Sequence, residues 1–161
     1  MKNNKLFLNY LYNAFYQVLL VIIPLITSPY ISRILGAEKI GIYSYTYSIV
    51  FYFGIFANLG INHYGNRTIA KCRDNKEKLD YCFSSIFILH VFLSIIILVI
   101  YYLFVFFVAK QYRSIFLIQS AYLISVSLDI SWLFFGLEEF KVIVGRNTCI
   151  KIITTILIFA I

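Results

Sequence analysis

The chain has 161 residues, of which 61% are hydrophobic, 19% aromatic and only 13% charged. Soluble domains carry about 25% charged residues, so this composition excludes an ordinary soluble fold, which could not bury so much apolar surface. The formal net charge is +7, but the cations lie in short segments between apolar runs and not on one folded face, which argues against nucleic acid as a partner.

The first apolar run, residues 9–35, is predicted to be an uncleaved transmembrane helix. Two lysines precede it, as in a signal peptide. However, Asn9, Asn13 and Gln17 interrupt the apolar stretch, and no A-x-A cleavage site follows. The run is long enough to cross a bilayer with tilt, and its two prolines predict a bend in its outer half.

Further apolar runs cover residues 40–63, 82–109, 114–136 and 148–161. Hydrocarbon offers a backbone no hydrogen-bond partner, so each run must form a helix, and roughly 20 apolar residues suffice to cross. The predicted fold class is therefore an all-α integral membrane protein with about five transmembrane helices. The last run stops without a polar exit, so we expect residues 1–161 to be the N-terminal part of a larger polytopic protein.

The distribution of cations predicts which side of the membrane each connector faces. With a cytoplasmic N-terminus, the inner segments hold ten cations: Lys2, Lys5, Arg67, Lys71, Arg73, Lys76, Lys78, Lys141, Arg146 and Lys151. The outer segments then hold four: Arg33, Lys39, Lys110 and Arg113. This positive-inside bias predicts a cytoplasmic N-terminus and places the charged connector at residues 65–80 in the cytoplasm.

Amide side chains recur at helical spacing in the first two runs. Asn9, Asn13 and Gln17 follow one another at four-residue intervals, and Asn58 and Asn62 repeat that interval. Four-residue spacing stacks side chains on one face of a helix. Such stripes either hydrogen-bond a neighbouring helix or line a water-filled path, and the sequence leaves both interpretations open.

Three charged residues are candidates for a role at membrane depth. Asp129 lies well inside an apolar run, where a carboxylate either forms a structural pair or serves transport coupling or substrate binding. Arg33 either snorkels to lipid headgroups or meets a phosphate. Lys151 is expected about one turn into the fifth run, and we predict that it approaches Asp129 across the hairpin between the fourth and fifth helices.

The sequence contains no signature of a metal site, a cofactor site or an enzyme. His90 has no second ligand at metal-binding spacing, and Cys72, Cys82 and Cys149 are interpreted as free thiols. A glycine-rich phosphate loop, a G-x-S-x-G elbow and an H-E-x-x-H motif are all missing from the sequence. We therefore expect no cofactor, no metal and no catalytic residue.

Three blocks of sequence together resemble one family. They are PLITSPYISRILGAEKIGIYSYTYSI (residues 24–49), FANLGINHYGNRTIAKCRDNKEKL (56–79) and DISWLFFGLEEFK (129–141). They resemble, in order, the N-terminal part of bacterial polysaccharide transporters, the O-antigen flippases often called Wzx. The resemblance covers nearly the whole chain.

The resemblance implies a fold of the multidrug/oligosaccharidyl-lipid/polysaccharide exporter superfamily, with two lobes around a central cavity. Residues 1–161 would then be the N-terminal part of a polytopic transporter domain, within its first lobe. The implied cargo is an undecaprenyl-pyrophosphate-linked oligosaccharide, moved across the bacterial inner membrane without ATP hydrolysis. Implied partners are this lipid-linked oligosaccharide, membrane lipids and other polysaccharide-assembly proteins. Cavity amides would contact sugars, and Arg33 and Lys151 would contact pyrophosphate.

Three alternative functions remain open at the level of sequence, and one of them is a purely structural membrane subunit. A drug or small-cation exporter of the same superfamily would be expected to carry acidic cavity residues, and Asp129 alone does not decide the matter. A membrane-embedded polysaccharide polymerase or glycosyltransferase would be expected to carry large outer loops, and the loops here are short. No residue indicates the sugar, the energy coupling or the oligomeric state.

Overall fold

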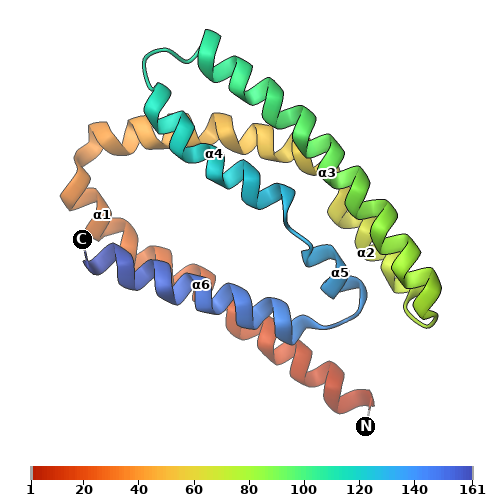
Figure 1. Ribbon diagram of the computed structural model, residues 1–161. Coiled ribbons are helices and arrows are strands. Elements are labelled where there is room, and N and C mark those ends of the chain that lie inside the picture. Colours follow the sequence, from red (N-terminus) through yellow and green to blue (C-terminus); the bar gives the residue numbers. More distant parts are fainter. Residues whose placement is uncertain (1, 161) are drawn as a thin grey trace. The chain divides into compact units, whose positions relative to one another are not determined.

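The computed structural model describes residues 2–160, without the side chains of residues 2–10, 12 and 13 (Figure 1). All regular structure in this part of the chain is helical, as the composition predicted. In chain order the helices are α1 (Lys2–Asn58), α2 (Ile61–Cys72), α3 (Lys76–Phe107), α4 (Arg113–Ser127), α5 (Ser131–Gly136) and α6 (Phe140–Ala160).

Within residues 2–160, four helical stretches are long and apolar enough to cross a membrane. They are Ala14–Cys72, Lys76–Phe107, Arg113–Gly136 and Phe140–Ala160. The first has 59 residues. As a straight helix it would extend about 88 Å, nearly three times the hydrocarbon thickness of about 30 Å. Gly36 interrupts it with φ 74° and ψ 166°, so this stretch consists of two helical parts.

The chain divides into two compact units, which we describe separately. The terminal unit comprises Met1–Ile40 and Glu138–Ile161, and the central unit comprises Gly41–Leu137. In the terminal unit α1 and α6 touch where the ring centroids of Tyr30 and Phe159 lie 4.7 Å apart.

The central unit buries two separate apolar clusters. The α3–α4 cluster consists of Val50, Tyr101, Val105, Phe116 and Leu123. The α2–α5 cluster consists of Ile61, Ile69, Ile86 and Trp132. Helix α3 contributes to both clusters and runs beside α2 at one end and α4 at the other (Figure 1).

The charged connector expected at residues 65–80 is mostly helical. Leu59 and Gly60 have positive φ angles, 40° and 78°, and end α1. Helix α2 then buries Ile61, Gly65 and Ile69, which are spaced by four residues, and turns its basic residues outward. The sequence suggested a loop because the charges of an amphipathic helix lie on its exposed face.

Other helix bounds also differ from expectation. Helix α3 begins at Lys76, although the sequence suggested a start at residue 82. The run at residues 114–136 is divided at residues 128–130, between α4 and α5. The last helix begins at Phe140, although the sequence suggested a start near residue 148. Gly145 does not delay that start, because one glycine in a helix costs only about 1 kcal/mol, and Ile143 and Val144 are buried beside it.

Candidate functional site

The central unit contains a layer of polar side chains between its two apolar clusters. Helix α3 buries one face along most of its length, formed by Ile86, His90, Ser94, Tyr101 and Val105. His90 is 0% exposed and Ser94 is 1% exposed. These two side chains therefore interrupt an otherwise apolar buried face, between Ile86 of one cluster and Tyr101 of the other.

The end of α4, just before its break from α5, lies level with His90. The Tyr101 hydroxyl donates to the Phe116 carbonyl at 2.5 Å, and the ring centroids of Phe83 and Trp132 are 5.7 Å apart. Between these two contacts α3 and the α4–α5 segment run antiparallel, which brings Val126 and Ser127 about level with His90, and Tyr122 and Leu123 about level with Ser94.

The break is held by hydrogen bonds that the sequence supplies locally. The Asp129 Oδ1 atom accepts from the Ser131 backbone N–H at 3.1 Å and from the Ser131 hydroxyl at 2.5 Å. These bonds satisfy one free amide at the start of α5, as a helix-capping side chain does. Ser127 and Ser131 are both buried. We call His90, Ser94, Ser127, Asp129 and Ser131 together the polar layer.

Several buried polar atoms near this layer have no hydrogen-bond partner among the described residues. They are both ring nitrogens of His90, the Ser94 hydroxyl, the Trp132 indole nitrogen and the Asn62 side-chain oxygen. A buried polar group without a partner costs about 1–3 kcal/mol, so native proteins retain few of them. The layer can exchange hydrogen bonds with water or a small polar ligand. Within the described part of the chain no three metal-ligating side chains gather to hold an ion.

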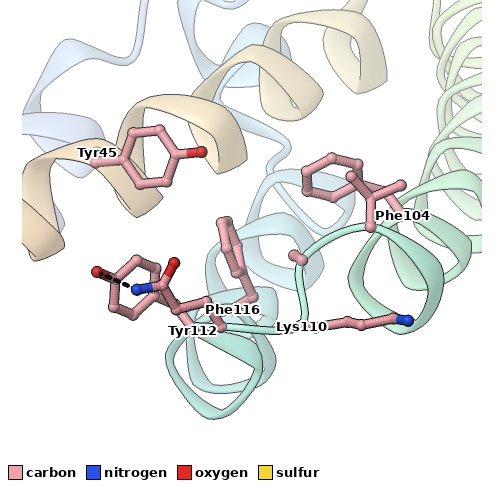
Figure 2. Close-up of a pocket in the computed structure, with 8 residues that line it drawn as sticks. Tyr45, Phe104, Lys110, Tyr112 and Phe116 are labelled. Carbon is pink, nitrogen blue, oxygen red and sulfur yellow. Dashed lines mark hydrogen bonds between the residues drawn. The ribbon is translucent and has the colours of Figure 1, made fainter.

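A second candidate site is a pocket of about 250 Å³ at the loop between α3 and α4 (Figure 2). Its lining is aromatic with a polar end and consists of Tyr45, Phe104, Val108, Ala109, Lys110, Gln111, Tyr112 and Phe116. The rings of Tyr45 and Tyr112 meet edge to face with centroids 6.4 Å apart. Gln111 donates from Nε2 to the Tyr112 hydroxyl at 3.2 Å. Aromatic rings beside an amide offer a mixed apolar and hydrogen-bonding surface.

The amides predicted from the sequence lie in different settings. The side chains of Asn9 and Asn13 lie outside the described residues, and Gln17 is exposed on α1. The structure brings Asn58 and Asn62 together, because the Asn58 side-chain oxygen accepts from the Asn62 backbone N–H at 3.2 Å. Asn58 thus supports the start of α2.

The predicted charged residues are distributed over both units. Arg33 is exposed on α1, and Lys151 is half-buried in α6. Since α6 begins at Phe140, Lys151 lies eleven residues, or about 16 Å, from the start of that helix and not one turn in. Asp129 belongs to the central unit and Lys151 to the terminal unit, so their pairing stays a prediction.

Sequence reasoning missed the two groupings that the fold creates. It considered His90 alone, and the placement of His90 beside the end of α4 depends on how α3 and α4 pair. The meeting of Tyr45 and Tyr112 likewise depends on packing between segments far apart in the sequence. The spacing of Asp129 and Ser131 was the one usable local signal, since an Asp side chain often bonds the backbone two residues on.

Comparison with known proteins identifies the relatives of this chain. A family model described as "Polysaccharide biosynthesis protein" matches residues 6–161. A "Putative O-antigen transporter" of Escherichia coli (strain K12) is 36% identical over 102 residues, which are 62% of this chain and 24% of the relative. A protein of Shigella dysenteriae with the same description is 32% identical over 161 residues, 99% of this chain and 39% of the relative.

The chain therefore spans less than half the length of the curated relatives it matches. No solved structure matches it. The resemblance to polysaccharide transporters noted from the three sequence blocks is confirmed.

Proposed function

Because this chain belongs to the polysaccharide biosynthesis protein family, we propose that it forms part of a transporter for lipid-linked oligosaccharides. The proposed cargo is an undecaprenyl-pyrophosphate-linked repeat unit, moved across the bacterial inner membrane by alternating access. The observation that carries this proposal is the family match over residues 6–161, on a chain with four stretches apolar enough to span a membrane.

The cation bias supports a proposed orientation. With the N-terminus in the cytoplasm, the basic turn between α2 and α3 faces the cytoplasm and the α3–α4 loop faces the periplasm. The pocket with Tyr45 and Tyr112 then opens on the exit side. Flat aromatic faces and an amide suit the apolar faces and hydroxyls of a sugar, so we assign the oligosaccharide part of the cargo to this pocket.

The anionic pyrophosphate requires cations at membrane depth. Lys151, about midway along α6, is the best-placed candidate in this chain, and Arg33 is a candidate nearer the outer end of its helix. We assign Gln17 and the amides on the same face, Asn9 and Asn13, to contacts with sugar hydroxyls in the cavity. The rest of the cationic site is assigned to the partner lobe.

The test is export in cells that lack the full-length parent protein. Lipid-linked repeat units should accumulate on the cytoplasmic leaflet, and surface polysaccharide should be lost. The full-length protein should restore export, whereas residues 1–161 alone should not, because one lobe cannot alternate access around a shared site. Normal surface polysaccharide in the deletion strain would contradict the function, and full rescue by the fragment would contradict the shared site.

The same assay tests the sugar pocket. Full-length protein with Tyr45→Leu and Tyr112→Leu should export several-fold less at equal membrane abundance. The matched control is Tyr81→Leu, at a side chain that is 76% exposed and outside the pocket lining. Equal export by the pocket variant and the control would remove the pocket from the mechanism.

A further inference from the structure

Two cysteines that the sequence suggested were independent lie side by side in the structure. The Sγ atoms of Cys72 and Cys82 are 2.8 Å apart, and both residues are half-buried free thiols. A disulfide requires sulfurs about 2.05 Å apart, so the two atoms need to move less than about 1 Å to bond. The third cysteine, Cys149, is exposed on α6 and belongs to the other unit.

The short turn between α2 and α3 fixes this proximity. Cys72 is the last residue of α2, and its carbonyl accepts from the Asn75 N–H at 3.1 Å. The Asn75 side chain then caps α3 by accepting from the Lys78 N–H at 3.1 Å. Cys82 follows in the second turn of α3. The two thiols therefore face each other across a hydrogen-bonded hairpin.

Buried contacts on both helices hold the hairpin in register. Ile69, about one turn before Cys72, is 0% exposed, and Ile86, one turn after Cys82, is 4% exposed. Both belong to the α2–α5 cluster, against which Cys82 itself packs. The thiols are thus placed by the packing of the helices and not by the conformation of a free loop.

We propose that Cys72 and Cys82 are a site of reversible oxidation, at which a disulfide fastens the end of α2 to α3. The oxidant is a small disulfide such as glutathione disulfide. One cysteine thiolate attacks it, forming a mixed disulfide and releasing one glutathione thiolate. The second cysteine thiolate then attacks the protein sulfur of the mixed disulfide and releases the second glutathione. The protein loses two electrons and two protons, and two molecules of reduced glutathione are formed.

The consequence is a redox-dependent restraint on α2. Helix α2 contacts α5 through Gly65, where an added Cβ would lie 2.7 Å from the Trp132 ring. A bond between Cys72 and Cys82 fixes α2 at its opposite end, against α3. In the oxidised form α2 is therefore restrained both by its contact with α5 at Gly65 and by the disulfide to α3. The inference depends only on the hairpin and not on the transported cargo.

The experiment uses the full chain in native membranes treated with glutathione disulfide. Remaining free thiols are blocked with N-ethylmaleimide, and the protein is digested with trypsin. Arg73, Lys76 and Lys78 lie between the two cysteines, so trypsin separates the two cysteine peptides unless a disulfide joins them. We expect a linked peptide pair that dithiothreitol releases and that Cys72→Ser and Cys82→Ser both abolish.

Cys149 supplies the internal control. The Cys149→Ser variant should form the Cys72–Cys82 link to the same extent as the unmodified chain, and Cys149 should carry only single glutathione adducts. Two results would overturn the proposal, because both would mean that the second thiol does not reach the first. In one, Cys72 and Cys82 each carry their own glutathione. In the other, both are alkylated as fully as Cys149.

Discussion

The two apolar clusters of the central unit are held by different kinds of contact. In the α3–α4 cluster large side chains meet, and the buried Tyr101 donates a hydrogen bond to the Phe116 carbonyl. In the α2–α5 cluster the backbones approach at glycines. A Cβ at Gly65 would lie 2.7 Å from the Trp132 ring, and one at Gly136 would lie 2.6 Å from two atoms of Ile69.

The difference shows two ways to join helices in a bilayer. Lipid tails are as apolar as the side chains, so burial alone provides little attraction between helices, which must instead gain from hydrogen bonds or from close van der Waals contact. A hydrogen-bonded cluster loses stability when a polar atom is removed. A glycine contact loses stability when one carbon is added. The α3–α4 cluster should therefore be sensitive to the removal of a polar atom, and the α2–α5 cluster to the addition of a methyl group.

The largest effect is expected at Gly136. In Gly136→Ala the new methyl would meet the Ile69 Cβ and Cγ2 at 2.6 Å and the Asn66 carbonyl oxygen at 3.0 Å. The Ile69 Cβ cannot swing away without backbone movement, so the free energy of unfolding should fall by about 3 kcal/mol. The measurement is denaturant-induced unfolding in detergent micelles, with membrane abundance as a second readout.

Two other glycines provide matched controls for this substitution. A Cβ at Gly54 would lie 3.0 Å from the Tyr122 ring edge, the far end of a side chain that can shift, so Gly54→Ala should cost less. A Cβ at Gly41 would meet no atom within 4 Å, so Gly41→Ala should be neutral or stabilising. Equal stability of all three variants would refute the glycine contact between α2 and α5.

A smaller effect is expected from Tyr101→Phe in the other cluster. This substitution removes the 2.5 Å hydrogen bond to the Phe116 carbonyl but keeps the ring that packs against Phe53. The loss should be about 1 kcal/mol, typical of one hydrogen bond between membrane helices. The same unfolding assay applies, with the exposed Tyr81→Phe as control. If Tyr101→Phe lowers the free energy of unfolding as much as Gly136→Ala does, the proposed difference between the two clusters is wrong.

The sequence could predict features that depend on composition, but not those that depend on how the helices pack. Composition and the lengths of the apolar runs were sufficient for an all-α membrane fold, because hydrocarbon permits few alternatives. The helix α2 was missed because its buried face holds only Ile61, Gly65 and Ile69, between charged residues. The break after Ser127 was missed because no proline or glycine marks it. The proximity of Cys72 and Cys82 depends on tertiary register, which single-sequence spacing does not contain.

The smallest effect concerns Asp129, which lies between the two clusters. If its main role is to cap α5, Asp129→Asn keeps the side-chain oxygen that accepts from Ser131 and should change the free energy of unfolding by less than about 0.5 kcal/mol. Asp129→Leu removes that acceptor and should cost about 1 kcal/mol. Membrane abundance and unfolding of the two variants are compared with the unmodified chain.

If Asp129 instead pairs with Lys151, Asp129→Asn should be the damaging change, at about 3 kcal/mol, and adding Lys151→Met should restore much of the loss. If Lys151→Met restores the stability of Asp129→Asn, the main role of Asp129 is the ion pair and not the cap of α5. If Asp129→Asn leaves the free energy of unfolding unchanged but abolishes export, Asp129 is a transport residue.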